Sequence, residues 1–264
     1  MPRTRTYGLD VDTIAYAARV KAGSGVTILP EPLKQLNKFI VGIKKLGLWN
    51  SMVCWPMRSI HNAGTGSTVY SLGGLGVYNG TLVNSPSWNE KGIIGNSTGS
   101  LSVVNFSLGS ITPSCIMVYN RLIPSESTRP QLYNSPINFG MNWANQGRTY
   151  ITGADSTNTS YGAYTVQNNF HNSSGFNTTS VEIAGVGAPV LLPFYVYENN
   201  NLVNLNQYDN PPLPFNSRQN FVQTLTLAYG SQQIPFLLFI SGRGANTIRS
   251  LYRSTLGIGL NLPY

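Results

Sequence analysis

From residue 51 onward the chain consists of short apolar or alternating runs separated by Gly, Asn, Pro and Ser. Runs spaced about 8–15 residues apart and broken by turn residues are typical of antiparallel strands. No repeat of fixed period is visible, which disfavours a propeller or a solenoid. The pattern therefore predicts a mainly β fold, an antiparallel sandwich or barrel. The expected strands are Met52–Trp55, Thr68–Leu72, Gly76–Val83, Leu101–Phe106, Cys115–Leu122, Ile137–Trp143, Arg148–Thr152, Gly162–Val166, Val181–Ala184, Val190–Tyr197, Leu202–Leu205, Phe221–Tyr229, Pro235–Ser241 and Leu256–Leu260.

The first 50 residues have a helical pattern instead. Residues 10–22 predict a short helix, and Asp10 or Asp12 suits its first turn because bare N–H groups and the helix dipole favour a carboxylate there. Residues 31–47 predict a second helix from an apolar stripe at steps of three and four residues. The stripe consists of Leu33, Leu36, Phe39, Ile40, Ile43 and Leu46.

The change of pattern near residue 50 predicts two parts of the chain. Residues 1–50 are expected to form a helical N-terminal docking segment, and residues 51–264 an antiparallel β-sandwich or barrel domain. Within the second part, residues 190–205 indicate a hairpin with an Asn-rich turn. The very polar stretch 153–180 predicts long exposed loops with one short strand between them.

Positive charge is concentrated in the helical segment. The net charge is +8, and five of the six lysines lie in the first 50 residues. A basic surface of this kind suits an acidic protein partner, or it is simply a solvated helix face. No nucleic-acid-binding motif accompanies it, so nucleic acid is not an expected partner. The candidate docking face comprises Arg3, Arg5, Lys34, Lys38, Lys44 and Lys45.

The side chains that carry most enzymatic chemistry are scarce. The chain has nine Asp and Glu, two His and two Cys in 264 residues, and the spacing indicates no metal cluster. Glycosidases need two convergent carboxyl groups, and no strand carries a closely spaced acidic pair. His61 and His171 are interpreted as polar loop residues. We therefore expect no catalytic residues, no metal and no cofactor, although two distant carboxylates could still meet in space.

Aromatic side chains are interspersed with amides and hydroxyls in the middle of the chain. Trp143, Tyr150, Tyr161 and Tyr164 lie among many Asn and Ser residues, a mixture that suits sugar contacts. The alternative is that these aromatic rings pack in the sandwich core or between subunits. Both interpretations remain open from the sequence.

Several segments together resemble structural proteins of tailed bacteriophages. They are DVDTIAYAARVKA, then NKFIVGIKKLGLWNSM with its K-x-x-G-x-W turn (Asn37–Met52), then NEKGIIGNSTGSLSV, SCIMVYNRL and FLLFISGRGAN. Proteins of this kind have a helical leader before a concanavalin A-like (lectin/glucanase-type) jelly roll, so the resemblance implies that residues 51–264 form a jelly-roll β-sandwich domain. The resemblance implies a virion component, such as a capsid decoration, a head fibre, or a tail fibre or tail tip. It also implies a homo-oligomer, often a trimer, that contacts other virion proteins.

The expected function is a non-enzymatic structural component of a virion. The N-terminus lacks an apolar signal segment, and no apolar run approaches the roughly 18 residues that span a bilayer, so we expect neither a secretory signal nor a membrane partner. The alternative function is a carbohydrate-binding module that recognises a host surface glycan. A glycan-degrading enzyme is the third hypothesis.

Overall fold

A computed structural model describes the backbone and side chains of residues 8–96, 98–106, 226–227 and 233–240, and the backbone of the remaining strands between 113 and 241. Within these residues the helices are α1 (Val11–Ser24), α2 (Pro30–Lys45) and the short 3-10 helices η1 (Trp49–Ser51) and η2 (Ser59–His61). The strands are β1 (Met52–Pro56), β2 (Thr68–Val69), β3 (Gly80–Val83), β4 (Ile93–Ile94), β5 (Ser100–Phe106), β6 (Pro113–Arg121), β7 (Gln131–Ser135), β8 (Gly140–Ala144), β9 (Arg148–Ala154), β10 (Ser160–Gln167), β11 (Gly175–Ile183), β12 (Phe194–Glu198), β13 (Asn201–Val203), β14 (Leu205–Gln207), β15 (Gln223–Ala228) and β16 (Gln233–Ser241).

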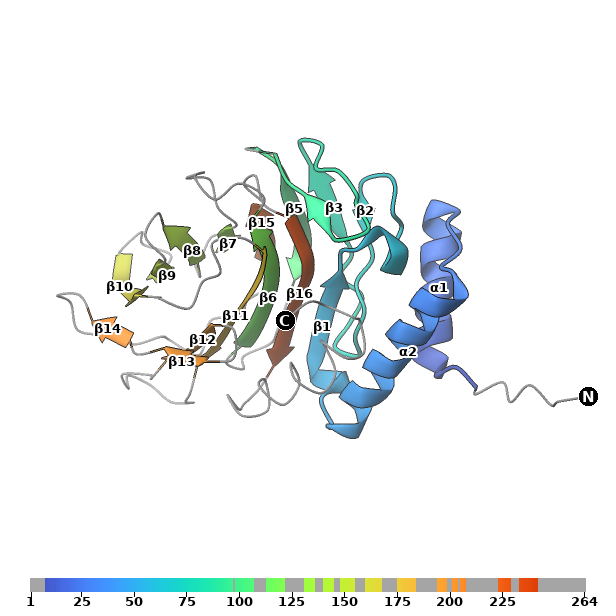
Figure 1. Ribbon diagram of the computed structural model, residues 1–264, viewed down its shortest axis with the longest axis horizontal. Helices are drawn as coiled ribbons and strands as arrows, with labels where there is room; N and C mark the ends of the chain where they lie inside the picture. The colour runs from blue at the N-terminus through green and yellow to red at the C-terminus, as the bar shows by residue number, and fades with distance from the viewer. Residues whose placement is uncertain are drawn as a thin grey trace, which may run out of the picture.

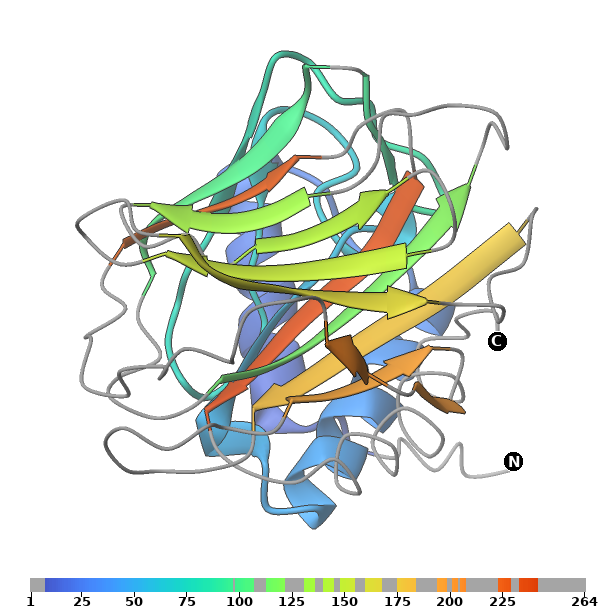
Figure 2. The ribbon, with the colours of Figure 1, turned by 90° about the vertical axis from the view of Figure 1, so that its left-hand side faces the viewer.

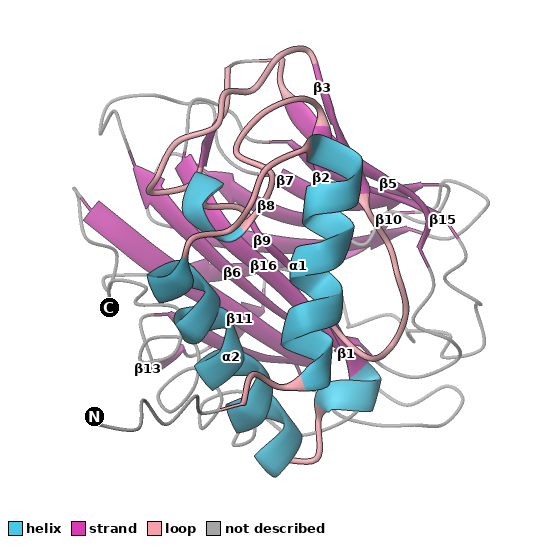
Figure 3. Cartoon of the chain, turned by 90° about the vertical axis from the view of Figure 1, so that its right-hand side faces the viewer, coloured by secondary structure: helices cyan, strands magenta, loops and turns pink. Residues whose placement is uncertain are grey.

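The described elements form three layers. Sheet A has the order β1-β16-β6-β11-β12-β13, with β4 added beside β16, and sheet B has the order β14-β10-β9-β8-β7-β15-β5-β3-β2. Sheet B faces one side of sheet A, and α1 and α2 cover the other side (Figures 1 and 2). Figure 3 shows both helices lying across the strands of sheet A. The expected mainly β fold, an antiparallel jelly-roll sandwich preceded by two helices, is confirmed.

Both predicted helices are present, with ends set by local chemistry. The Asp10 side chain accepts a hydrogen bond from the Asp12 N–H at 2.9 Å and so caps α1. Gly25, with φ 75°, ends α1 in the left-handed conformation that glycine tolerates. Most of the predicted apolar stripe of α2 faces inward, with Leu36, Phe39, Ile40 and Ile43 fully buried, but Leu46 lies just beyond the end of the helix and is 39% exposed.

Strands β1 and β16 belong to sheet A, the central layer, and are buried on both faces. Met52 of β1 pairs with Ile240, and Cys54 pairs with Leu238, so these side chains share one face. They belong to a single hydrophobic cluster with the inward face of the helices. The helices and sheet A therefore share one core, which the boundary near residue 50 does not divide.

The opposite face of the same two strands packs against sheet B. Trp55 of β1 and Phe239 of β16 contact Phe106 of β5, with ring centroids 5.7 and 5.3 Å from that ring. Tyr78 meets Phe106 edge-on at 5.3 Å. These tilted and edge-to-face contacts are geometries that aromatic pairs prefer, and they fix the spacing of the two sheets.

The interpretation of residues 153–180 as mainly exposed loops is wrong. Strand β10 and most of β11 lie in this stretch, and β11 is a long strand between β6 and β12. The short strand expected at Gly162–Val166 is present within β10, whereas residues 175–180 of β11 are not predicted from the sequence to form a strand, because their Asn, Ser and Thr lack the apolar alternation by which strands are recognised. The predicted hairpin at residues 190–205 is present as β12 paired with β13. The expected strand Leu256–Leu260 lies outside the described residues.

Candidate functional site

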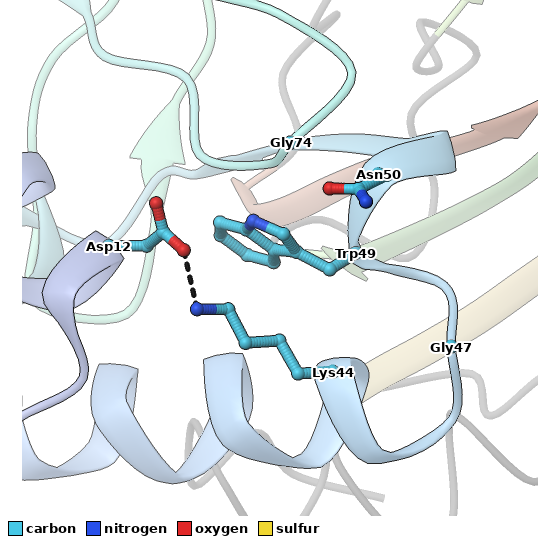
Figure 4. Close-up of a pocket in the computed structure, with 6 residues that line it drawn as sticks. All are labelled: Asp12, Lys44, Gly47, Trp49, Asn50 and Gly74. Carbon is cyan, nitrogen blue, oxygen red and sulfur yellow. Dashed lines mark ion pairs between the residues drawn. The ribbon is translucent and has the colours of Figure 1, made fainter.

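A cavity of about 550 Å³ opens where the start of α1 meets the end of α2. The 3-10 helix η1 follows α2 directly and forms a second wall, and the loop between β2 and β3 forms a third. Figure 4 shows the residues that line it. They are Asp12, Lys44, Gly47, Trp49, Asn50 and Gly74.

Lys44 is the charged centre of this cavity. Its Nζ lies 2.6 Å from Asp10 Oδ1 and 2.5 Å from Asp12 Oδ2, and 5.4 Å from the centre of the Trp49 ring. The ammonium group therefore has two carboxylate partners and an aromatic ring beside it, which is an arrangement that a cation favours. These contacts tie the end of α2 to the start of α1.

The ion pairs shift the pKa values of Asp10 and Lys44. Partial burial acts to raise the pKa of Asp10, but hydrogen bonds from Lys44 and from the Asp12 N–H outweigh it and lower that pKa. Burial likewise acts to lower the pKa of Lys44, while its bonds to Asp10 and Asp12 raise it above the usual value. Asp10 and Lys44 are therefore both charged near neutral pH.

Three polar groups on the cavity wall have no protein partner in the part of the chain that the structure describes. They are the second carboxylate oxygen of Asp12, the indole Nε1–H of Trp49 and the side-chain amide of Asn50. Figure 4 shows Asp12 and Asn50 on opposite sides of the indole ring. Together they provide hydrogen-bond donors and acceptors around one space.

Gly74 brings the third wall close to the other two. Its N–H donates to the carbonyl of Trp49 at 2.9 Å. A Cβ at this position would lie 2.8 Å from both Asn50 Oδ1 and Trp49 Cδ1, so only glycine allows the loop to approach so closely. The K-x-x-G-x-W turn contributes Lys44, Gly47 and Trp49 to the lining. The sequence singled out this turn but gave no signal for a cavity beside it.

The predicted docking residues occupy different environments. Lys44 lies in the cavity, and Lys34 forms an exposed ion pair with Glu31 at 2.5 Å. Lys38 and Lys45 are exposed on α2. Arg3 and Arg5 lie outside the described residues. Whether these basic residues form a docking face stays a prediction.

The candidate glycan contacts lie on three neighbouring strands of sheet B. Trp143 of β8 pairs with Thr149 of β9, whereas Tyr150 pairs with Asn142. In β10, Tyr164 pairs with Ile151 and Tyr161 with Gly153. By the alternation of register positions, residues 143, 161 and 164 share one face of the sheet, and residue 150 lies on the other.

His61 is not the polar loop residue that the sequence indicated. It is fully buried in η2, where Nε2 lies 2.6 Å from Gln35 Oε1 of α2, and its carbonyl accepts the Tyr16 hydroxyl. Its Nδ1 is buried without a partner among the described residues. Burial first, and then the charge of Arg58, lower the pKa of His61 to about 3. The earlier interpretation failed because it rested on the polar, glycine-bearing neighbours of His61. His171 lies outside the described residues.

This depressed pKa predicts acid sensitivity. In the unfolded chain the imidazole binds a proton near its ordinary pKa of 6.5, so the unfolded state holds more protons as the pH falls from 6.5 toward 3. Stability is then lost at about 1.4 kcal/mol per pH unit, or about 3 kcal/mol by about pH 4.5. We expect His61→Gln to be less stable than wild type at neutral pH but to lose about 3 kcal/mol less on acidification. Urea unfolding at neutral pH and at about pH 4.5 measures the free energy of unfolding of both proteins, and an equal loss in the two would contradict the prediction.

The described residues contain no group of three or more His, Cys, Asp or Glu side chains close enough to hold a metal ion. Among the same residues, no helix combines the length and the apolar character that crossing a bilayer requires. The chemistry that this part of the chain offers is hydrogen bonding, charge pairing and aromatic contact.

Comparison with known proteins gives no family. No protein-family model matches the chain, and no curated protein matches it. Solved structures with some likeness include domain 4 of AbnA, an extracellular arabinanase of Geobacillus stearothermophilus in complex with arabinotriose, at 10% identity and a TM-score of 0.40, covering 76% of this chain and 87% of that one. A Trypanosoma rangeli sialidase has 10% identity and a TM-score of 0.45, with 87% of this chain and 40% of that chain covered. The binding domain of botulinum neurotoxin serotype D/C has 11% identity and a TM-score of 0.48, over 80% of this chain and 53% of that one.

Proposed function

We propose that the protein is a non-enzymatic structural component of a bacteriophage particle, held in place by contacts between proteins. The observation that carries the proposal is the outer face of the helical layer, the side of α1 and α2 turned away from sheet A (Figure 3). It combines exposed apolar side chains with exposed lysines. The resemblance of the first 50 residues to phage structural proteins supports the same function.

The outer face has an apolar part and a basic part. On α1, Val11 and Ile14 are 73% and 53% exposed. On α2, Lys34, Lys38 and Lys45 are exposed at positions that recur on one side of the helix. A helical layer with both exposed apolar and exposed basic side chains suits a neighbouring subunit with an acidic surface, because opposite charges steer and orient the contact.

Reversing the basic part tests this function. The triple variant Lys34→Glu, Lys38→Glu, Lys45→Glu places negative charge against an acidic neighbour, and we expect its incorporation into particles to fall about tenfold or more. Its melting temperature should change little, because exposed substitutions alter stability by about 0.5 kcal/mol or less each. The measurement is the copy number per purified particle, taken by quantitative mass spectrometry from phage that encode the variant.

Lys91→Glu is the control, because this lysine is exposed on the loop before β4 and not on either helix. It should be incorporated at the wild-type level. Normal incorporation of the triple variant, in particles that contain the wild-type protein, would contradict docking through the outer face.

A second candidate function is recognition of a host surface glycan by sheet B. The register of β8, β9 and β10 favours it, since it brings the positions of Trp143, Tyr161 and Tyr164 to one face of adjacent strands. Aromatic residues at register positions on one face of a sheet suit stacking against sugar rings. In this case Trp143→Ala would remove glycan binding.

A further inference from the structure

We propose that the cavity between α1, α2 and η1 is a binding site for a neutral saccharide. This goes beyond a structural role, which requires no small ligand. It also differs from the sheet B candidate, because the cavity is formed by the helical layer and the loop before β3. The lining residues that carry the proposal are Asp12, Trp49 and Asn50.

The first argument is the hydrogen-bonding capacity of the wall. One oxygen of Asp12 accepts, the indole Nε1–H of Trp49 donates, and the amide of Asn50 does both, and within the described residues none of these groups has a protein partner. A sugar hydroxyl donates and accepts at once. A ring with several hydroxyls therefore matches a wall that offers both kinds of group around one space.

The second argument is electrostatic. A bound anion would lie beside the carboxylates of Asp10 and Asp12, which disfavours it. A bound cation would compete with Lys44, which already occupies the position between these carboxylates and the Trp49 ring. A neutral ligand avoids both costs, and it can also accept a hydrogen bond from the Lys44 ammonium group.

The third argument is size and rigidity. A volume of about 550 Å³ lies within the range of roughly 300–1,000 Å³ that small-molecule sites occupy. Lys44 is fixed by two carboxylates, and the Gly74 N–H bond to the Trp49 carbonyl holds the loop against η1. The wall is therefore largely formed before a ligand arrives, which reduces the entropy lost on binding.

The test uses the full chain on an array of immobilised saccharides, both neutral and charged, with the strongest neutral saccharide then titrated in free form. Asn50→Ala is the main variant, because this side chain is exposed and its loss should leave the melting temperature unchanged. We expect its affinity for the neutral saccharide to fall at least tenfold. Asp12→Asn keeps the shape of the side chain and should weaken binding as well.

Two control variants make the outcome decisive. Lys45→Ala, one residue beyond Lys44 but outside the cavity lining, should bind like wild type. Trp143→Ala should also bind like wild type. Full binding by Asn50→Ala together with loss in Trp143→Ala would overturn the proposal and favour sheet B. Binding restricted to charged saccharides, or to no saccharide on the array, would overturn it too. Neither result depends on whether the protein is incorporated into particles, so the saccharide site and the docking function are tested separately.

Discussion

Deleting residues 8–51 is expected to leave a chain that does not fold. The deletion uncovers the outward face of the central strands, whose side chains are at most 2% exposed in the intact protein. Burial of one large apolar side chain stabilises a protein by about 1.5–3 kcal/mol, and the net stability of a domain is only about 5–15 kcal/mol. Exposing a whole face therefore removes a free energy as large as the net stability. The side chains of the face that the deletion uncovers are Met52, Cys54, Phe236, Leu238 and Ile240.

The measurement is the soluble fraction on expression, followed by near-UV circular dichroism and dye binding to exposed apolar surface. Point variants on α2 provide the matched comparison. Ile40→Asp places a charge at a fully buried position and should have the same effect. Lys38→Asp, two residues earlier and exposed, should remain folded. A soluble, cooperatively unfolding protein that lacks residues 8–51 would contradict the shared core.

Phe236→Ala is expected to destabilise the protein by about 3–5 kcal/mol, the usual effect of removing a buried phenylalanine ring. Phe236 is fully buried in β16, pairs with Pro56 of β1, and meets the Phe39 ring of α2 edge-on at 5.8 Å. The substitution leaves a cavity between the helices and sheet A. It also removes the edge-to-face contact that joins these two layers.

Chemical denaturation monitored by circular dichroism measures this effect. The matched control is Val104→Ala, since Val104 lies in β5 but is 62% exposed, and its truncation should change stability by about 0.5 kcal/mol or less. A loss below about 1 kcal/mol for Phe236→Ala would mean that the helices are not packed on β16 as described.

The local part of the fold could be predicted from the sequence, because local patterns encode it. The apolar stripe of α2, the Asp10 cap and the apolar runs of β1 and β16 all have a recognisable period or composition. Their placement could not be predicted. Nothing in a run such as PFLLFIS shows that it lies between β1 and β6, because partners far apart in sequence are selected by packing.

The cavity illustrates the same limit. Asp12 is readily interpreted as a helix cap, Lys44 as a solvated charge and Trp49 as part of a turn, and each interpretation is locally reasonable. Their meeting depends on how α1 crosses α2, which tertiary contacts decide. The burial of His61 could not be predicted for a related reason, because η2 is covered by α1 and α2 and the sequence around His61 gives no sign of that contact.

The position of β16 between β1 and β6 has a consequence for synthesis in the cell. Because Met52 of β1 pairs with Ile240 of β16, this edge of sheet A cannot form until β16 has been synthesised, which delays the pairing of β1. At translation speeds of about 5–20 residues per second, that delay is roughly 10–40 seconds. During this delay the apolar side chains of β1 that pack beside β16 in the folded protein lack these neighbours, and exposed apolar surface favours aggregation. The packing of the helices on both strands therefore forms only after most of the described strands have been synthesised.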